Sequence, residues 1–101
     1  LKELFDVASV FLNQPLPRGE RIAIVSNAGG PAILATDACE GHGMPFAELA
    51  EETKAALRAA LPPEASVANP VDLIASADAK AYDASLRSVL ADAHVDAAIV
   101  I

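Results

Sequence analysis

The sequence predicts an α/β domain in which helices flank a parallel sheet. The unbroken apolar run Ile22–Val25 is typical of a strand that is covered on both faces, and Val95–Ile101, apolar except for Asp96, is interpreted as a second buried strand. Between them lie segments whose apolar residues recur at helical spacing, two of which end at glycine or proline. Strands that alternate with helices in this way form a parallel sheet. Because the last strand runs to the final residue, we expect the sheet to be truncated at its C-terminal end.

Composition narrows the classes of function. The chain has 101 residues, of which 53% are hydrophobic, so it is long enough for one small folded domain or part of a larger one. Its formal net charge is −7, and its seven Lys and Arg residues are scattered, which argues against nucleic acid and anionic membrane as partners. A lone cysteine, with no signal-peptide pattern and no membrane-length apolar run, favours a cytoplasmic protein.

The first segment, Leu1–Asn13, has the apolar spacing of an amphipathic helix, and Pro15 and Pro17 end it. We expect this helix to pack on the domain from outside. Residues 1–19 are therefore interpreted as a linker helix and turn, and residues 20–101 as the α/β subdomain.

The middle of the chain predicts further elements in order. Gly41-His42-Gly43 marks a helix end, and Asp78 is a plausible N-cap. The expected elements are a short strand within Met44–Leu49, a helix over Ala50–Leu61, a brief strand over Val71–Ile74 and a helix over Asp78–Asp92.

The stretch Ser26–Gly30 is the main candidate site. It follows the first buried strand, and Pro31, which suits the first turn of a helix, follows it directly. A helix that begins at such a turn points free backbone N–H groups and the positive end of its dipole at one spot, where an anion such as a phosphoryl group binds. The alternative is that Gly29 and Gly30 only allow strand and helix to pack closely, and the residues alone favour neither interpretation.

Three runs together resemble the NDP-forming acyl-CoA synthetases, which include the ADP-forming acetyl-CoA synthetases and are relatives of succinyl-CoA synthetase. The runs are IAIVSNAGGPAILATDA, EETKAALRAALPPEASVANPVDL and VDAAIVI, and they span nearly the whole chain. The resemblance implies a flavodoxin-like, succinyl-CoA synthetase-like subdomain. It implies an enzyme that converts acyl-CoA, phosphate and a nucleoside diphosphate to acid, CoA and the triphosphate, with a histidine that carries the phosphoryl group.

By this resemblance, Asn27, Ala28, Gly29 and Gly30 contact phosphate, and Asn69 and Asp72 of NPVDL line the same face. For Asn69 and Asp72, a purely structural role in a rigid loop is an equally good interpretation. The catalytic histidine of the family lies in an SHTG-like motif that is absent here, so the chain holds no catalytic residue and is expected to be inactive alone.

The resemblance also implies partners and cofactors. The parent enzyme is implied to use CoA, ADP or ATP, Mg²⁺ and phosphate, and of these only phosphate is expected to contact this chain. The implied partners are the CoA-binding, phosphohistidine and ATP-grasp domains of the same enzyme. No metal site is expected, since Cys39 has no partner at metal-ligand spacing and is interpreted as a buried filler. His42 is interpreted as a helix-end residue.

Two other classes of function remain open at this point. Some bacterial protein lysine acetyltransferases contain a synthetase-like region of this kind as a regulatory or scaffold module. A ligand-binding α/β module that only forms subunit contacts is the third possibility.

Overall fold

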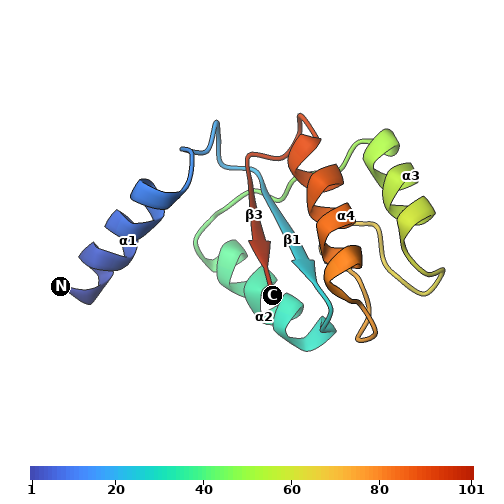
Figure 1. Cartoon of the computed structure of the whole chain (residues 1–101). Coiled ribbons are helices and arrows are strands. Elements are labelled where there is room, and N and C mark those ends of the chain that lie inside the picture. Colours follow the sequence, from blue (N-terminus) through green and yellow to red (C-terminus); the bar gives the residue numbers. More distant parts are fainter.

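The computed structural model describes all residues from 1 to 101 and contains four helices and three parallel strands in the sheet order β2-β1-β3. The elements in chain order are α1 (Lys2–Asn13), β1 (Ile22–Ser26), α2 (Gly29–Gly41), α3 (Glu51–Ala60), β2 (Val71–Asp72), α4 (Ala79–Ala91) and β3 (Ala97–Val100). Helix α2 lies on one side of the sheet, and α3 and α4 lie on the other (Figure 1). The predicted α/β class is therefore confirmed.

Strand β1 is the centre of the core, and all five of its residues are buried. Ile22 and Ile24 pack toward α2, whereas Ala23 and Val25 pack toward α3 and α4. The larger cluster, on the α3 and α4 side, consists of Ala23, Val25, Leu49, Leu57, Leu61, Val71, Leu73 and Val89. The apolar run in the sequence was thus correctly interpreted as a strand covered on both faces.

Several predicted boundaries shift in the structure. Helix α2 begins at Gly29, two residues before Pro31, and proline is tolerated there because the first turn has no acceptors for its N–H groups. Met44–Leu49 is not a strand, since only Phe46 forms an isolated parallel bridge, to Ile22. Strand β2 stops at Asp72 and not at Ile74, because Ile74 has a φ of 61°, which no strand accommodates.

Helix α2 ends at the Gly-His-Gly segment, as predicted, and the structure shows that this end is a Schellman motif. Gly43 has a φ of 67°, and its N–H donates to the Glu40 carbonyl oxygen at 2.9 Å. The N–H of Met44 donates to the Cys39 carbonyl oxygen at 3.0 Å, and His42 Nδ1 donates to the Ala38 carbonyl oxygen at 2.8 Å. His42 is therefore a helix-end residue, and Cys39 is buried as expected.

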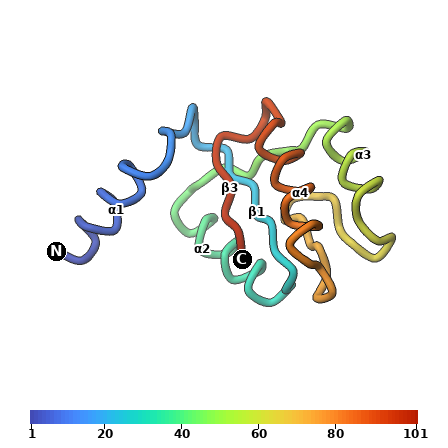
Figure 2. Tube along the Cα trace, in the orientation of Figure 1, coloured from blue at the N-terminus to red at the C-terminus, as the bar shows by residue number.

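Helix α1 does not pack on the domain, and that expectation was wrong. None of its residues is buried, and the trace reaches the rest of the chain through one connecting segment (Figure 2). Gln14 has extended φ and ψ angles of −137° and 150°. Pro15 and Pro17 then fix two further φ values, so the connection holds the helix away from the sheet.

Two buried carboxylates join the ends of distant elements. Asp96, which precedes β3, accepts hydrogen bonds from Arg21 Nε at 2.8 Å, Arg21 Nη2 at 3.1 Å and the Arg21 N–H at 3.0 Å. Asp92, which follows α4, accepts from the N–H of Ala50 and the N–H of His94, each at 2.8 Å. Asp92 therefore supplies, from a distant part of the chain, a partner at the start of α3, where Ala50 offers no side-chain cap.

Hydrogen bonds lower the pKa values of both carboxyl groups. The Arg21 guanidinium is the main cause for Asp96, and the Arg21 backbone N–H adds to it. For Asp92 burial is the largest influence and raises the pKa, but hydrogen bonds from His94, Thr53 and Ala50 together outweigh it.

Substitution of Gly43 by alanine is expected to lower the free energy of unfolding by roughly 1–2 kcal/mol, because a Cβ is strained at positive φ. Gly41→Ala, in the same helix, is the matched control. Its Cβ meets nothing within 4 Å, so the free energy should rise by about 0.5–1 kcal/mol. Urea unfolding monitored by circular dichroism measures both. Equal effects of the two substitutions would contradict this account of the helix end.

Acid is expected to weaken the fold through Asp96. Because its pKa is lower in the folded than in the unfolded chain, the ionised carboxylate stabilises the fold above the unfolded value of about 3.9, and this contribution is lost as the pH falls toward the folded value. The free energy of unfolding should therefore fall more steeply between pH 5 and pH 3 in the wild type than in Asp96→Asn. Asp37→Asn, at an exposed carboxyl group of α2, should keep the wild-type slope.

Candidate functional site

The glycine turn lies at the carboxyl end of the central strand. Ser26 ends β1, and α2 begins three residues later at Gly29. In the register of the sheet, Ser26 pairs with Asp72, which ends β2. The glycine turn and the Asp72 loop therefore share the edge of the sheet at which ligands bind in open α/β folds.

Three backbone amides in this turn are free. The N–H groups of Asn27, Gly29 and Gly30 have no hydrogen-bond acceptor within the chain. The Ala28 N–H is different, because it donates to Ser26 Oγ at 3.0 Å, and this hydroxyl donates in turn to the Ala28 carbonyl oxygen at 2.9 Å. Since no side chain caps α2, its free amides and the positive end of its dipole point into solvent.

The fold itself does not require either glycine of the turn. Neither Gly29 nor Gly30 has a positive φ. A Cβ added to Gly30 would meet nothing within 4 Å, and one added to Gly29 would meet only Asp72 Oδ2, at 3.8 Å. Alanine would therefore fit at both positions, and close packing of strand and helix does not explain the glycines. A bare backbone at an open helix N-terminus suits close approach by another group.

Asp72 sets the electrostatics of this edge. Its Oδ1 accepts the Ile74 N–H at 2.9 Å, and this bond supports Ile74 at its strained positive φ. Its Oδ2 is the atom that faces Gly29. An ionised carboxylate beside the free amides opposes the binding of a bare anion and favours a ligand that also presents a hydrogen-bond donor or a cation.

Asn69 lies inside the sheet, at the other end of β1. Its Oδ1 accepts the Ile24 N–H at 2.9 Å, and its Nδ2 donates to the carbonyl oxygens of Ile22 at 2.8 Å and Ala47 at 3.0 Å. The carboxamide thus replaces a backbone partner in the gap between β2 and the segment around Ala47. All three bonds serve the sheet, which favours the structural interpretation of Asn69.

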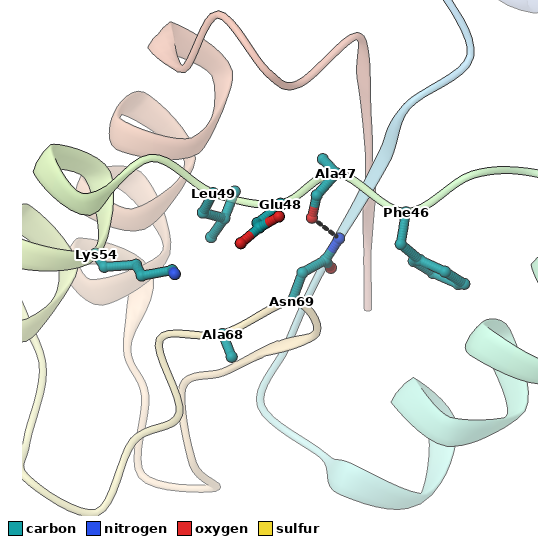
Figure 3. A pocket seen from close by; sticks show the side chains of 7 residues that line it. All are labelled: Phe46, Ala47, Glu48, Leu49, Lys54, Ala68 and Asn69. Carbon is teal, nitrogen blue, oxygen red and sulfur yellow. Dashed lines mark hydrogen bonds between the residues drawn. The ribbon is translucent and has the colours of Figure 1, made fainter.

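A cavity of about 380 Å³ lies beside Asn69 and is shown in Figure 3. It adjoins the start of β1 and not the glycine turn. Lys54, the cationic residue of its lining, forms an ion pair with Glu51 at 2.9 Å. The seven lining residues are Phe46, Ala47, Glu48, Leu49, Lys54, Ala68 and Asn69.

The histidines lie away from the turn. His42 caps the opposite end of α2, and His94 Nδ1 donates to the Glu48 carbonyl oxygen at 2.9 Å. No group of three or more His, Cys, Asp or Glu side chains is arranged to hold a metal ion. No helix has the length and apolarity that a membrane span needs.

Sequence reasoning missed the part that Ser26 plays. The structure shows that its buried hydroxyl accepts the Ala28 N–H and donates to the Ala28 carbonyl oxygen. In an ST turn the serine is the first residue and its side-chain oxygen accepts the N–H two residues later, so a serine at the end of a strand and before glycines was a usable signal.

The structure defines an α/β domain whose central parallel strand leads into an uncapped, glycine-bearing helix N-terminus. The profile of the Ligase-CoA domain matches residues 22–101. The chain therefore belongs to the Ligase-CoA domain family, as the sequence resemblance indicated, and its relatives are ADP-forming acyl-CoA ligases.

Individual relatives are similar over the whole chain. The acetate–CoA ligase [ADP-forming] II subunit alpha of Pyrococcus furiosus is 45% identical over all of this chain, which covers 22% of that subunit. The 4-hydroxybutyrate–CoA ligase [ADP-forming] of Nitrosopumilus maritimus is 40% identical over 98% of this chain and 14% of the ligase. The chain thus spans about a fifth or less of these relatives.

A solved structure of a synthetase has the same fold over this chain. The dinucleotide-forming acetyl-coenzyme A synthetase 1 of Ca. Korarchaeum cryptofilum, in complex with phosphate and ADP, superposes with a TM-score of 0.87 at 29% identity. The match covers 99% of this chain and 22% of the synthetase, so α1 belongs to the shared arrangement.

Asn69→Ala is expected to lower the free energy of unfolding by roughly 2–4 kcal/mol, because it leaves the Ile24 N–H and two carbonyl groups without their partner. Asn27→Ala, at the glycine turn, should change it by no more than about 0.5 kcal/mol, since no hydrogen bond of its side chain holds the fold. Chemical denaturation of both variants checks this. If Asn69→Ala lowers the free energy of unfolding only slightly, the structural role is contradicted and a ligand contact at Asn69 is favoured.

Proposed function

We propose that this chain is one domain of an ADP-forming acyl-CoA synthetase and that the N-terminus of α2 cradles a phosphoryl group in transit. The longer protein would convert acyl-CoA, phosphate and ADP to acid, CoA and ATP. The phosphoryl group would arrive on a histidine that another domain provides. The chain itself would supply backbone amides and a helix dipole, and no catalytic side chain.

The observation that supports this proposal is the pair of glycines that the fold does not need. Gly29 and Gly30 leave space in front of free amides at the edge where β1 and β2 end. Asn27 adds a third free N–H, so we propose Asn27, Gly29 and Gly30 as the phosphate contacts. Ala28 would contribute through its conformation, because Ser26 already accepts its N–H.

Weak binding is what a transfer site requires. Each charge–dipole interaction at a helix terminus contributes on the order of 0.3–2 kcal/mol. Asp72 beside Gly29 reduces the affinity for a bare anion. A phosphoryl group bound by amides and opposed by a carboxylate can leave again, whereas a lysine at the same place would retain it more strongly.

The other reactants would bind outside this chain. We propose that CoA, the nucleotide and Mg²⁺ are held by further domains of the longer synthetase, with which this domain forms contacts. The relatives described above are ligases or synthetases, which supports a ligase over the acetyltransferase scaffold and over a module that only forms subunit contacts.

Gly30→Ala is expected to separate binding from stability. A methyl group in the open space should weaken phosphate binding by about fivefold, from the loss of roughly 1 kcal/mol of hydrogen bonding. The same substitution should raise the free energy of unfolding by about 0.4–1 kcal/mol, because it restricts the unfolded chain. Titration of the ¹⁵N-labelled chain with inorganic phosphate at constant ionic strength measures the affinity from amide shifts.

In the wild type, the amide resonances of Asn27, Gly29 and Gly30 should shift together and saturate, while that of Ala28 moves less. Gly41→Ala, near the other end of α2, is the control and should leave the phosphate affinity unchanged. If none of the turn amides responds, or if shifts scatter over the surface without saturation, the phosphoryl cradle is wrong.

A further inference from the structure

Asp72 holds one carboxylate oxygen free beside the glycine turn. Its Oδ1 accepts the Ile74 N–H at 2.9 Å, whereas its Oδ2 accepts no hydrogen bond from the chain. None of the ion pairs in the structure includes Asp72. The free oxygen is therefore an acceptor that no donor and no cation of this chain occupies.

The backbone on both sides of Asp72 fixes the position of this oxygen. The Asp72 N–H donates to the Ser66 carbonyl oxygen at 3.0 Å, and the Ser66 N–H donates to the Asp72 carbonyl oxygen at 2.9 Å. The flanking side chains of Val71 and Leu73 are completely buried in the core. With one carboxylate oxygen bonded to Ile74, the other is held at the edge of the sheet where the glycine turn lies.

Gly29 leaves the space in front of Asp72 Oδ2 open. A Cβ on Gly29 would lie 3.8 Å from Oδ2 and would meet no other atom within 4 Å. A ligand atom can therefore enter this space and approach the carboxylate to the roughly 2.5–2.7 Å of an O–H···O⁻ hydrogen bond. The N–H groups of Gly29 and Gly30, which are free, flank the Gly29 Cα, so donors and an acceptor meet at one place.

A ligand at this place needs both kinds of hydrogen-bonding group. The backbone amides donate and bind an anionic oxygen, whereas an ionised carboxylate only accepts. An oxyanion without a proton would put one of its oxygens against Asp72, and the two negative charges would repel each other. An oxyanion that keeps a proton satisfies both partners, because its hydroxyl donates to Oδ2 while its other oxygens accept from the amides.

We propose that Asp72 is a specificity-determining residue that selects protonated phosphate over an oxyanion without a proton. Inorganic phosphate near neutral pH carries at least one P–OH group, and sulfate carries none. The P–OH group donates to Asp72 Oδ2, and the amides of Asn27, Gly29 and Gly30 bind the other oxygens. This inference rests on the phosphoryl cradle proposed above and deepens it by naming the form of phosphate that the site accepts.

Titration with sodium phosphate and with sodium sulfate at pH 8 and constant ionic strength tests the proposal. At this pH both ions carry close to two negative charges, so the proton is the main difference between them. Carbon-detected spectra of the ¹³C,¹⁵N-labelled chain report the ¹⁵N shifts of the turn without the amide protons, which exchange rapidly with water. The wild type should bind phosphate at least about tenfold more tightly than sulfate, because a charge-assisted hydrogen bond is replaced by repulsion.

Asp72→Asn is the decisive variant. Its carbonyl oxygen keeps the hydrogen bond to the Ile74 N–H, and its amide places an N–H donor where Oδ2 was. The affinity for sulfate should rise and that for phosphate should fall, so the preference should drop below about twofold. Asp37→Asn is the matched control, since it removes the same charge at an exposed position of α2, and it should keep the wild-type preference.

A second background guards against loss of the fold. Ile74 has a φ of 61°, which glycine adopts without strain, so Ile74→Gly should hold the loop with less help from Asp72. Asp72→Asn in the Ile74→Gly background should lose the preference for phosphate in the same way, whereas Ile74→Gly alone should retain it.

Each remaining outcome also decides the question. If phosphate and sulfate bind the wild-type turn with equal affinity, Asp72 does not select the proton, although the phosphoryl cradle stands. A preference that persists in Asp72→Asn assigns the selection to another group and overturns the role of Asp72. If neither ion shifts the resonances of the turn, the cradle and this inference are both wrong.

Discussion

The burial of β1 is the constraint on which the rest of this structure depends. It is the one strand with hydrogen-bonded neighbours on both sides and a packed helical layer on both faces. Because β1 is enclosed on all sides, the positions of its two ends are fixed by the core. The connection from α1 enters at one end and the glycine turn begins at the other, so the packing of β1 determines where the candidate site lies.

Side chains complete the framework where backbone partners are missing. Asn69 bridges a gap in the sheet that the two-residue strand β2 is too short to fill, and Asp92 serves the uncapped start of α3. Buried polar groups are expensive to leave unpaired, so these contacts define which loops lie where as firmly as the apolar core does. The polar residues of the NPVDL segment therefore have a structural role that does not require contact with a ligand.

The candidate site is built almost entirely from backbone. Ser26 shapes the turn, Gly29 and Gly30 leave it open, and Asp72 adds a negative charge beside it. Such a site recognises shape and charge, and the phosphoryl group that we propose for it would be held only moderately. That property agrees with the length of this chain relative to its family, since a domain that spans about a fifth of a ligase subunit is expected to contribute one part of a shared site.

The sequence by itself determined the α/β class, the buried central strand, the helix with its glycine end and the family. These follow from local periodicity, from residues with special backbone preferences and from contiguous motifs. Only the tertiary structure decided that Asn69 belongs to the sheet, that Asp92 reaches the N-terminus of α3, that α1 stands apart and that the glycines of the turn are not needed for packing. Each of these depends on which atoms meet across more than ten residues of sequence, and no local pattern encodes that distance.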